Sequence, residues 1–163
     1  VLGGMPAVIQ TFLTEASMKK AQDMQTILLT NYENDFGKYA KRVPVETMQM
    51  VFRKIPNLVA KTFKYVHVSA DIQSRSLKVA LKKLVQAGVV HQVFLTRASG
   101  LPLNSLINER KFKCLYLDVG LVKRNAYLDA EILMQEDLFL VNVLVGDYFI
   151  TDVFHILRKL VTE

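Results

Sequence analysis

The sequence predicts a mainly α fold with a small β wing: a helical hairpin, a winged helix-turn-helix and C-terminal helices. Apolar residues recur at helical spacing through the first forty residues. A strongly amphipathic helix predicted at 74–87 is followed by two short segments that alternate like strands. Hydrophobic residues make up 51% and charged residues 22% of the 163 residues, which is typical of a globular chain.

The length suits one ordinary domain with a small helical attachment. We expect an N-terminal helical segment at 1–42, a winged-helix domain at 43–125 and a C-terminal helical segment at 126–163. In the first segment, Pro6 suits the first position of a helix, where its missing N–H costs nothing. Ser17 is a suitable N-cap for a second, longer helix that reaches Tyr39.

The second segment opens with a helix over 44–61 that Pro56 breaks or restarts. Residues 63–68 alternate and predict a short strand. Ser74 is expected to cap the helix at 74–87, and Gly88 suits the left-handed position that follows a helix.

Two strands are predicted at 89–96 and 112–117, joined by a long loop over 97–110. Asp118 can cap a short helix at 119–124. The third segment predicts helices at 128–134, 137–145 and 147–160.

Charge is unevenly distributed along the chain, whose formal net charge is +6. Between Lys38 and Arg124 there are 17 basic and four acidic side chains, while the flanks hold four basic and 11 acidic ones. A basic middle between acidic ends is consistent with a surface for a polyanion, although lysine-rich solvated surfaces are also common.

The order helix, turn, basic helix, strand, loop, strand is that of a winged helix. Such a helix can enter the major groove of DNA when its outward face carries donors for phosphates and base edges. Lysines outnumber arginines here, which favours phosphate contact over base readout. The candidate nucleic-acid-binding residues lie on the basic helix and around the wing loop: Arg75, Lys78, Lys82, Lys83, Arg97, Arg110 and Lys111.

Several short motifs, in order, resemble a family of large bacterial and archaeal ATPases. They match a domain of unknown function that follows an AAA+-type ATPase module and usually precedes a restriction-nuclease-like domain. The resemblance runs from about Gly3 to Asn142. It is carried by residues 3–8, 32–39, 55–56, 64–65, 84–90, 101–103 and 115–121.

The resemblance implies that 1–42 is the end of an ATPase-type lid, that a winged helix follows, and that the partner is a nucleic acid. Double-stranded DNA is the candidate we consider. The chain departs from the family because it contains no Gly-x-x-x-x-Gly-Lys-Ser/Thr loop to cradle a nucleotide phosphate. It also shows no nuclease carboxylate set.

Nothing in the sequence predicts an enzyme, a cofactor or a metal site. There is no nucleophile elbow, and His67, His91 and His155 show no metal-type spacing with each other or with Cys114. Cys114 alternates within a strand-like segment and is expected to be a small buried hydrophobe. A lone cysteine and the lack of a signal-like start predict a cytoplasmic protein.

The alternative hypothesis is a protein–protein docking or oligomerisation module that works with an ATPase or with another copy of itself and does not contact DNA. The apolar stretch Leu138 to Val161 supports it, because so short a chain offers little to cover that stretch. Four charged side chains interrupt the stretch, so we expect it not to span a membrane.

Overall fold

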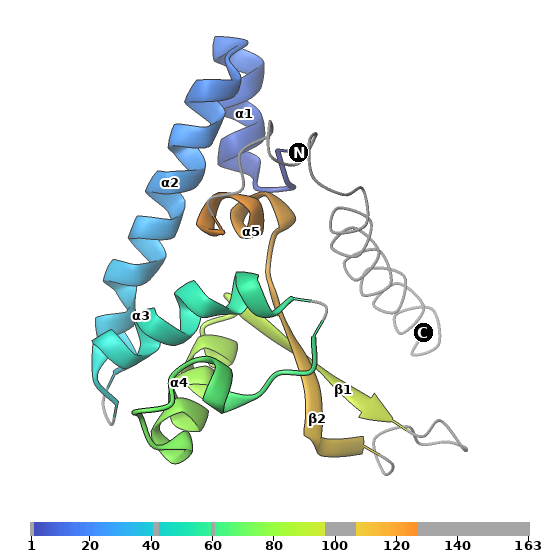
Figure 1. The fold of residues 1–163 in the computed structure, drawn as a ribbon. Coiled ribbons are helices and arrows are strands. Elements are labelled where there is room, and N and C mark those ends of the chain that lie inside the picture. The colour runs from blue at the N-terminus through green and yellow to red at the C-terminus, as the bar shows by residue number, and fades with distance from the viewer. Residues whose placement is uncertain (1, 41–42, 60, 97–106, 127–163) are drawn as a thin grey trace, which may run out of the picture.

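A computed structural model describes residues 2–40, 43–59, 61–96 and 107–126. The described part is mainly helical, with one small antiparallel sheet (Figure 1). This confirms the predicted mixture of helices and a two-stranded ribbon. The expected helices at 128–134, 137–145 and 147–160, and residues 97–106 of the expected loop, lie outside the described residues.

The N-terminal segment is the predicted helical hairpin, formed by α1 (Pro6–Glu15) and α2 (Met18–Asp35), with a short 3-10 helix η1 (Phe36–Lys38) after it. Pro6 opens α1 as expected. The Ser17 hydroxyl caps α2 by accepting a hydrogen bond from the Lys20 amide at 3.4 Å. Both signals in the sequence therefore located a helix start correctly.

Helix α3 (Val45–Lys54) runs into a 3-10 helix, η2 (Ile55–Leu58), at Pro56. The prediction of a break there is confirmed. The prediction of a strand over 63–68 is wrong, because Tyr65–His67 form a third 3-10 helix, η3. Among the described backbone hydrogen bonds of this segment, one connects it to the sheet. The Phe63 amide donates to the Phe112 carbonyl at 2.8 Å.

Helix α4 (Ser74–Gln86) is the predicted amphipathic helix. Its N-cap is Gln73, without a side-chain bond, so the expectation that Ser74 caps it is wrong by one residue. Its C-terminus ends in a Schellman motif: the Gly88 amide donates to the Val85 carbonyl and the Val89 amide to the Leu84 carbonyl. Gly88 has φ +74°, the left-handed conformation that glycine adopts without strain.

Strands β1 (Val90–Thr96) and β2 (Ile107–Tyr116) pair antiparallel, with Val90 opposite Tyr116 and Phe94 opposite Phe112. Strand β2 begins five residues before the predicted start at 112, so residues 107–110 belong to the strand and not to the loop. The register shifts after Phe94, whose neighbour Leu95 lies opposite Asn108. Residues 109–111 therefore have no partner in β1 and form a bulge.

Helix α5 (Val119–Asn125) is capped as predicted, because the Asp118 carboxylate accepts from the Leu121 amide at 3.0 Å. One hydrophobic core joins α2, η1, α3, α4, the sheet and α5. It includes Leu29 and Phe36 from the N-terminal segment together with residues of α3, α4, the sheet and α5. The predicted segments 1–42 and 43–125 thus share a core in the described structure.

Candidate nucleic-acid interface

Helix α4 separates apolar and basic side chains on opposite faces. Leu77, Ala80, Leu81 and Leu84 are buried in the core, where they pack α4 against α3 and the sheet. Arg75, Lys78 and Lys82 are exposed, and Lys83 is half-buried at the border. The helix contains no acidic residue over its 13 positions. Because the apolar face of α4 is packed into the core, the three basic side chains on its opposite face point into solvent.

The spacing of these charges follows from helix geometry. Residues 75, 78 and 82 are three and four positions apart, so they form one row along the helix. With a rise of 1.5 Å per residue, the row spans about 10 Å. At an axial rise of about 3.4 Å per nucleotide along one strand, a row of this length corresponds to about three nucleotide repeats.

Two further predicted residues, Arg110 and Lys111, are exposed in the bulge of β2. Asn108 fixes the backbone there, because its side-chain oxygen accepts a hydrogen bond from the Arg110 amide at 3.0 Å. Glu109, also exposed, is the acidic member of the bulge. Arg97, the remaining predicted residue, lies outside the described residues.

Sequence reasoning missed two residues that lie in or beside strand β2. Asn108 orients the bulge, but an asparagine in an expected loop carries no sign of that role. Lys64 is exposed and follows Phe63, whose backbone amide bonds to β2 at Phe112. Lys64 therefore lies beside the strand that carries Lys111. In the sequence, Lys64 is marked only by its position in the basic region between Lys38 and Arg124.

Arg53 does not join this surface, because it binds within the fold. Its guanidinium donates two hydrogen bonds to the Glu33 carboxylate, at 2.8 and 2.6 Å, and so joins α3 to α2. A bidentate arrangement fixes both side chains in one geometry.

Cys114 is buried in β2, as predicted for a small hydrophobe. Burial raises the pKa of its thiol to about 12. Among the described residues, no three histidine, cysteine, aspartate or glutamate side chains gather closely enough to hold a metal ion. The described part of the chain also contains no helix that is both long and apolar enough to cross a membrane.

The raised pKa predicts an unreactive native thiol. Because the thiolate is the reactive form, and an unfolded thiol ionises near pH 8.5, modification by a disulfide reagent at pH 8 should be about 10³-fold slower in the native protein than in denaturant. Raising the pH toward 12 should accelerate the native reaction. A kinetic thiol assay measures this, with Cys114→Ala as the blank. A full equivalent reacting at once under native conditions would contradict the burial.

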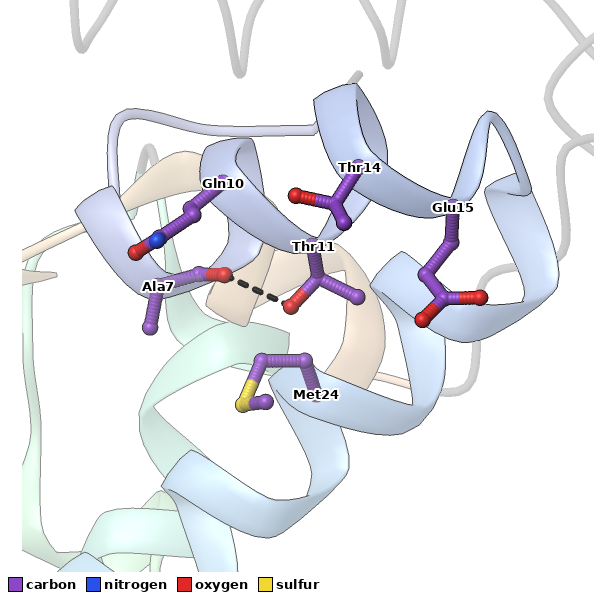
Figure 2. Close-up of a pocket in the computed structure, with 6 residues that line it drawn as sticks. All are labelled: Ala7, Gln10, Thr11, Thr14, Glu15 and Met24. Carbon is purple, nitrogen blue, oxygen red and sulfur yellow. Dashed lines mark hydrogen bonds between the residues drawn. The ribbon is translucent and has the colours of Figure 1, made fainter.

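A shallow pocket of about 290 Å³ lies between α1 and α2 (Figure 2). One of its hydroxyls, that of Thr11, donates to the Ala7 carbonyl at 2.8 Å. Glu15 supplies the one carboxylate of the lining, and no histidine, cysteine or basic side chain accompanies it. The lining consists of Ala7, Gln10, Thr11, Thr14, Glu15 and Met24.

The fold defines a mainly helical domain with a two-stranded antiparallel sheet. A family model matches residues 1–131, which include every described element, and the chain belongs to that family, Domain of unknown function (DUF8612). Searches of curated proteins and of solved structures gave no match.

Proposed function

We propose that this domain is a non-enzymatic winged-helix module that binds double-stranded nucleic acid, mainly through phosphates. The observation that carries the proposal is the row of exposed basic side chains on α4 opposite a fully buried apolar face. The order of elements supports it. Helix α3, the Phe63 bridge to β2, η3, α4 and the β1–β2 ribbon follow one another as the parts of a winged helix do.

In this proposal α4 faces the duplex and the bulge of β2 contacts the neighbouring backbone. Lysine and arginine neutralise phosphates without reading sequence, so affinity should depend strongly on salt. The motifs shared with ATPase-associated domains support a role alongside an ATPase in the cytoplasm, and we propose that association on the resemblance.

Lys78→Ala/Lys82→Ala tests the proposal without disturbing the core, since both side chains are exposed. We expect affinity for a random-sequence duplex to fall about tenfold at low salt. The slope of log K against log salt should become about two units shallower, because each phosphate contact contributes about 0.9. Fluorescence anisotropy at several salt concentrations measures both.

The matched control is Lys19→Ala/Lys20→Ala, which removes the same charge from exposed positions of α2. It should leave affinity and slope nearly unchanged. Equal losses in the two variants would show that only net charge matters and would contradict a site on α4. Absence of binding by the unaltered protein at low salt would reject the nucleic-acid hypothesis.

The second candidate function is protein docking or oligomerisation without DNA contact. One observation favours it: Leu13 on α1 is 75% exposed, and Ile9, one helical turn before it, is exposed as well. Ile9→Glu/Leu13→Glu should then convert an oligomer to a monomer in analytical ultracentrifugation. A monomer before and after the change would count against self-association through α1.

A further inference from the structure

Four aromatic rings gather where the chain before α4 passes strand β2. Phe63 stacks on Phe112 with the ring centroids 5.4 Å apart, and Phe94 of β1 lies 5.6 Å from Phe112 at a tilt. Tyr65 packs nearly perpendicular to Phe63, with 5.3 Å between the centroids. We name Phe63, Tyr65, Phe94 and Phe112 the wing aromatic cluster.

The inner rings of this cluster are buried, and the outer ones are partly open to solvent. Phe63 and Phe112 are 3% and 7% exposed and belong to the hydrophobic core. Tyr65 and Phe94 are half-buried and pack against that core from its margin. Because the inner rings already hold the outer ones in place, a ligand that stacks on Tyr65 or Phe94 orders few side chains when it binds.

Basic side chains lie beside the cluster. Lys64 and Lys111 are exposed, and each directly precedes a ring of the cluster. The backbone hydrogen bond donated by the Phe63 amide to β2 holds their two segments side by side. Arg110 is also exposed in the bulge, where Glu109 is the one acidic side chain. The open rings therefore lie in surroundings that attract an anion.

Aromatic rings next to cations suit unpaired nucleotides, because a base stacks on the ring while lysine or arginine contacts its phosphates. In the interior of a duplex the neighbouring bases cover each base, so a ring can stack only on a base that is unpaired or terminal. We propose that the wing aromatic cluster binds an unpaired nucleotide, whose base stacks on Tyr65 or Phe94. Its phosphates contact Lys64, Arg110 and Lys111.

The cluster adjoins the proposed duplex surface. Helix η3, which begins at Tyr65, contacts α4. Figure 1 shows the chain between η2 and α4 passing β2 before it reaches α4. A duplex on α4 and a single strand at the cluster can therefore belong to one ligand, a duplex with a single-stranded tail. The inference rests on the proposed function, because it takes nucleic acid as the ligand.

Fluorescence anisotropy with two tailed duplexes tests the proposal. One duplex carries a short thymidine tail, and the other carries a tail of abasic nucleotides with the same number of phosphates. The unaltered protein should bind the thymidine tail about tenfold more tightly, since stacking of one base on an aromatic side chain contributes an effect of this size. In Tyr65→Ala this preference should fall to less than about twofold, while affinity for a blunt duplex stays the same.

Three variants make the test specific. Tyr65→Phe keeps the ring and should keep the preference. Tyr65→Leu keeps apolar volume without a π face, so it should fold as judged by circular dichroism and still lose most of the preference. Tyr39→Ala is the matched control, because Tyr39 also follows a lysine, is 42% exposed and lies outside the cluster. It should leave the preference unchanged.

The two proposals fail in different ways. Equal affinity of the unaltered protein for the two tails would overturn the aromatic site, even if the blunt duplex binds through α4. Binding of the thymidine tail without binding of the blunt duplex would reject the duplex on α4 and support the aromatic site. Equal losses in Tyr65→Ala and Tyr39→Ala would overturn it. If Tyr65→Ala keeps the preference but dissociates an oligomer in ultracentrifugation, the rings form a protein contact and the proposal is wrong.

Discussion

Replacing Phe52 with alanine should lower the free energy of unfolding by about 3–5 kcal/mol, the usual cost of emptying a large aromatic site in a core. Phe52 is fully buried and lies between two other rings. Its ring stacks on Tyr116 at 4.6 Å between centroids and meets the edge of Phe36 at 5.2 Å. Loss of the ring therefore removes contacts that α3 makes with η1 and with β2.

The backbone adds to this coupling. The Tyr116 hydroxyl donates to the Phe52 carbonyl and accepts from the side-chain amide nitrogen (Nδ2) of Asn125. Tyr116 thus ties β2 to α3 and α5, and the packing of Phe52 sets how Tyr116 lies. A cavity beside Tyr116 should loosen the attachment of the ribbon to the helices, which is the relation the proposed nucleic-acid surface depends on.

Urea unfolding followed by circular dichroism measures the loss. Phe52→Leu, which keeps most of the apolar volume, should cost clearly less than alanine. Lys54→Ala, an exposed change two residues away, should stay within about 0.5 kcal/mol of the unaltered protein. A Phe52→Ala variant within 1 kcal/mol would mean that the site collapses and that this cluster is not the centre of the core.

Three helix boundaries were predictable from sequence because they depend on neighbouring residues. Ser17 and Asp118 each cap the helix that follows them, and Gly88 closes α4, since these interactions span three to five positions along the chain. The two faces of α4 were predictable for the same reason, because a buried stripe at helical spacing leaves the opposite side to solvent.

Residues 63–68 were mispredicted because two spacings coexist there. Phe63 and Tyr65 alternate like a strand, and their rings lie 5.4 and 6.3 Å from Phe112. Tyr65 and Val68, however, are three residues apart, which is the repeat of a 3-10 helix, and Val68 is buried. Val66 between them is exposed. Which of the two spacings determines the structure depends on contacts with β2, a strand that is distant in the sequence.

The bulge in β2 was beyond sequence reasoning. Glu109, Arg110 and Lys111 are all polar and exposed, so no alternation marks them as part of a strand. Their place in β2 follows from pairing on both sides, at Asn108 and Phe112, with residues of β1. The candidate residues on α4 could therefore be placed from sequence, whereas the setting of Arg110 and Lys111 required the register.

The Asp118 carboxylate holds the segment before α1 against the start of α5. Asp118 is 6% exposed, and its second oxygen accepts from the Gly4 amide at 2.5 Å, while the first caps α5. Gly3 has φ +81°, and a Cβ there would lie 2.2 Å from the Asp118 carboxylate. The close approach of the chain to Asp118 thus requires glycine at position 3.

Asp118→Ala should therefore destabilise the protein by about 2–4 kcal/mol. Loss of an N-cap costs about 0.5–2 kcal/mol, and loss of the partly buried hydrogen bond from Gly4 to a charged carboxylate costs about 1.5–3 kcal/mol. Asp118→Asn separates the two terms, because its one side-chain oxygen can keep the cap but not both bonds. It should lie between the unaltered protein and alanine, and Asp71→Ala, at an exposed position, should have little effect.

Chemical unfolding gives the two free energies, and hydrogen exchange shows where each acts. In Asp118→Asn the Gly4 amide should exchange faster while α5 keeps its protection, whereas in Asp118→Ala both should lose protection. The pKa of Tyr32 reports on the negative charge of Asp118. Burial is the larger cause that raises this pKa, and the charge of Asp118 is the smaller one. Either substitution should lower that pKa toward its ordinary value. Equal stabilities for Asn and Ala would show that the cap of α5 contributes nothing and that the bond to Gly4 accounts for the whole loss.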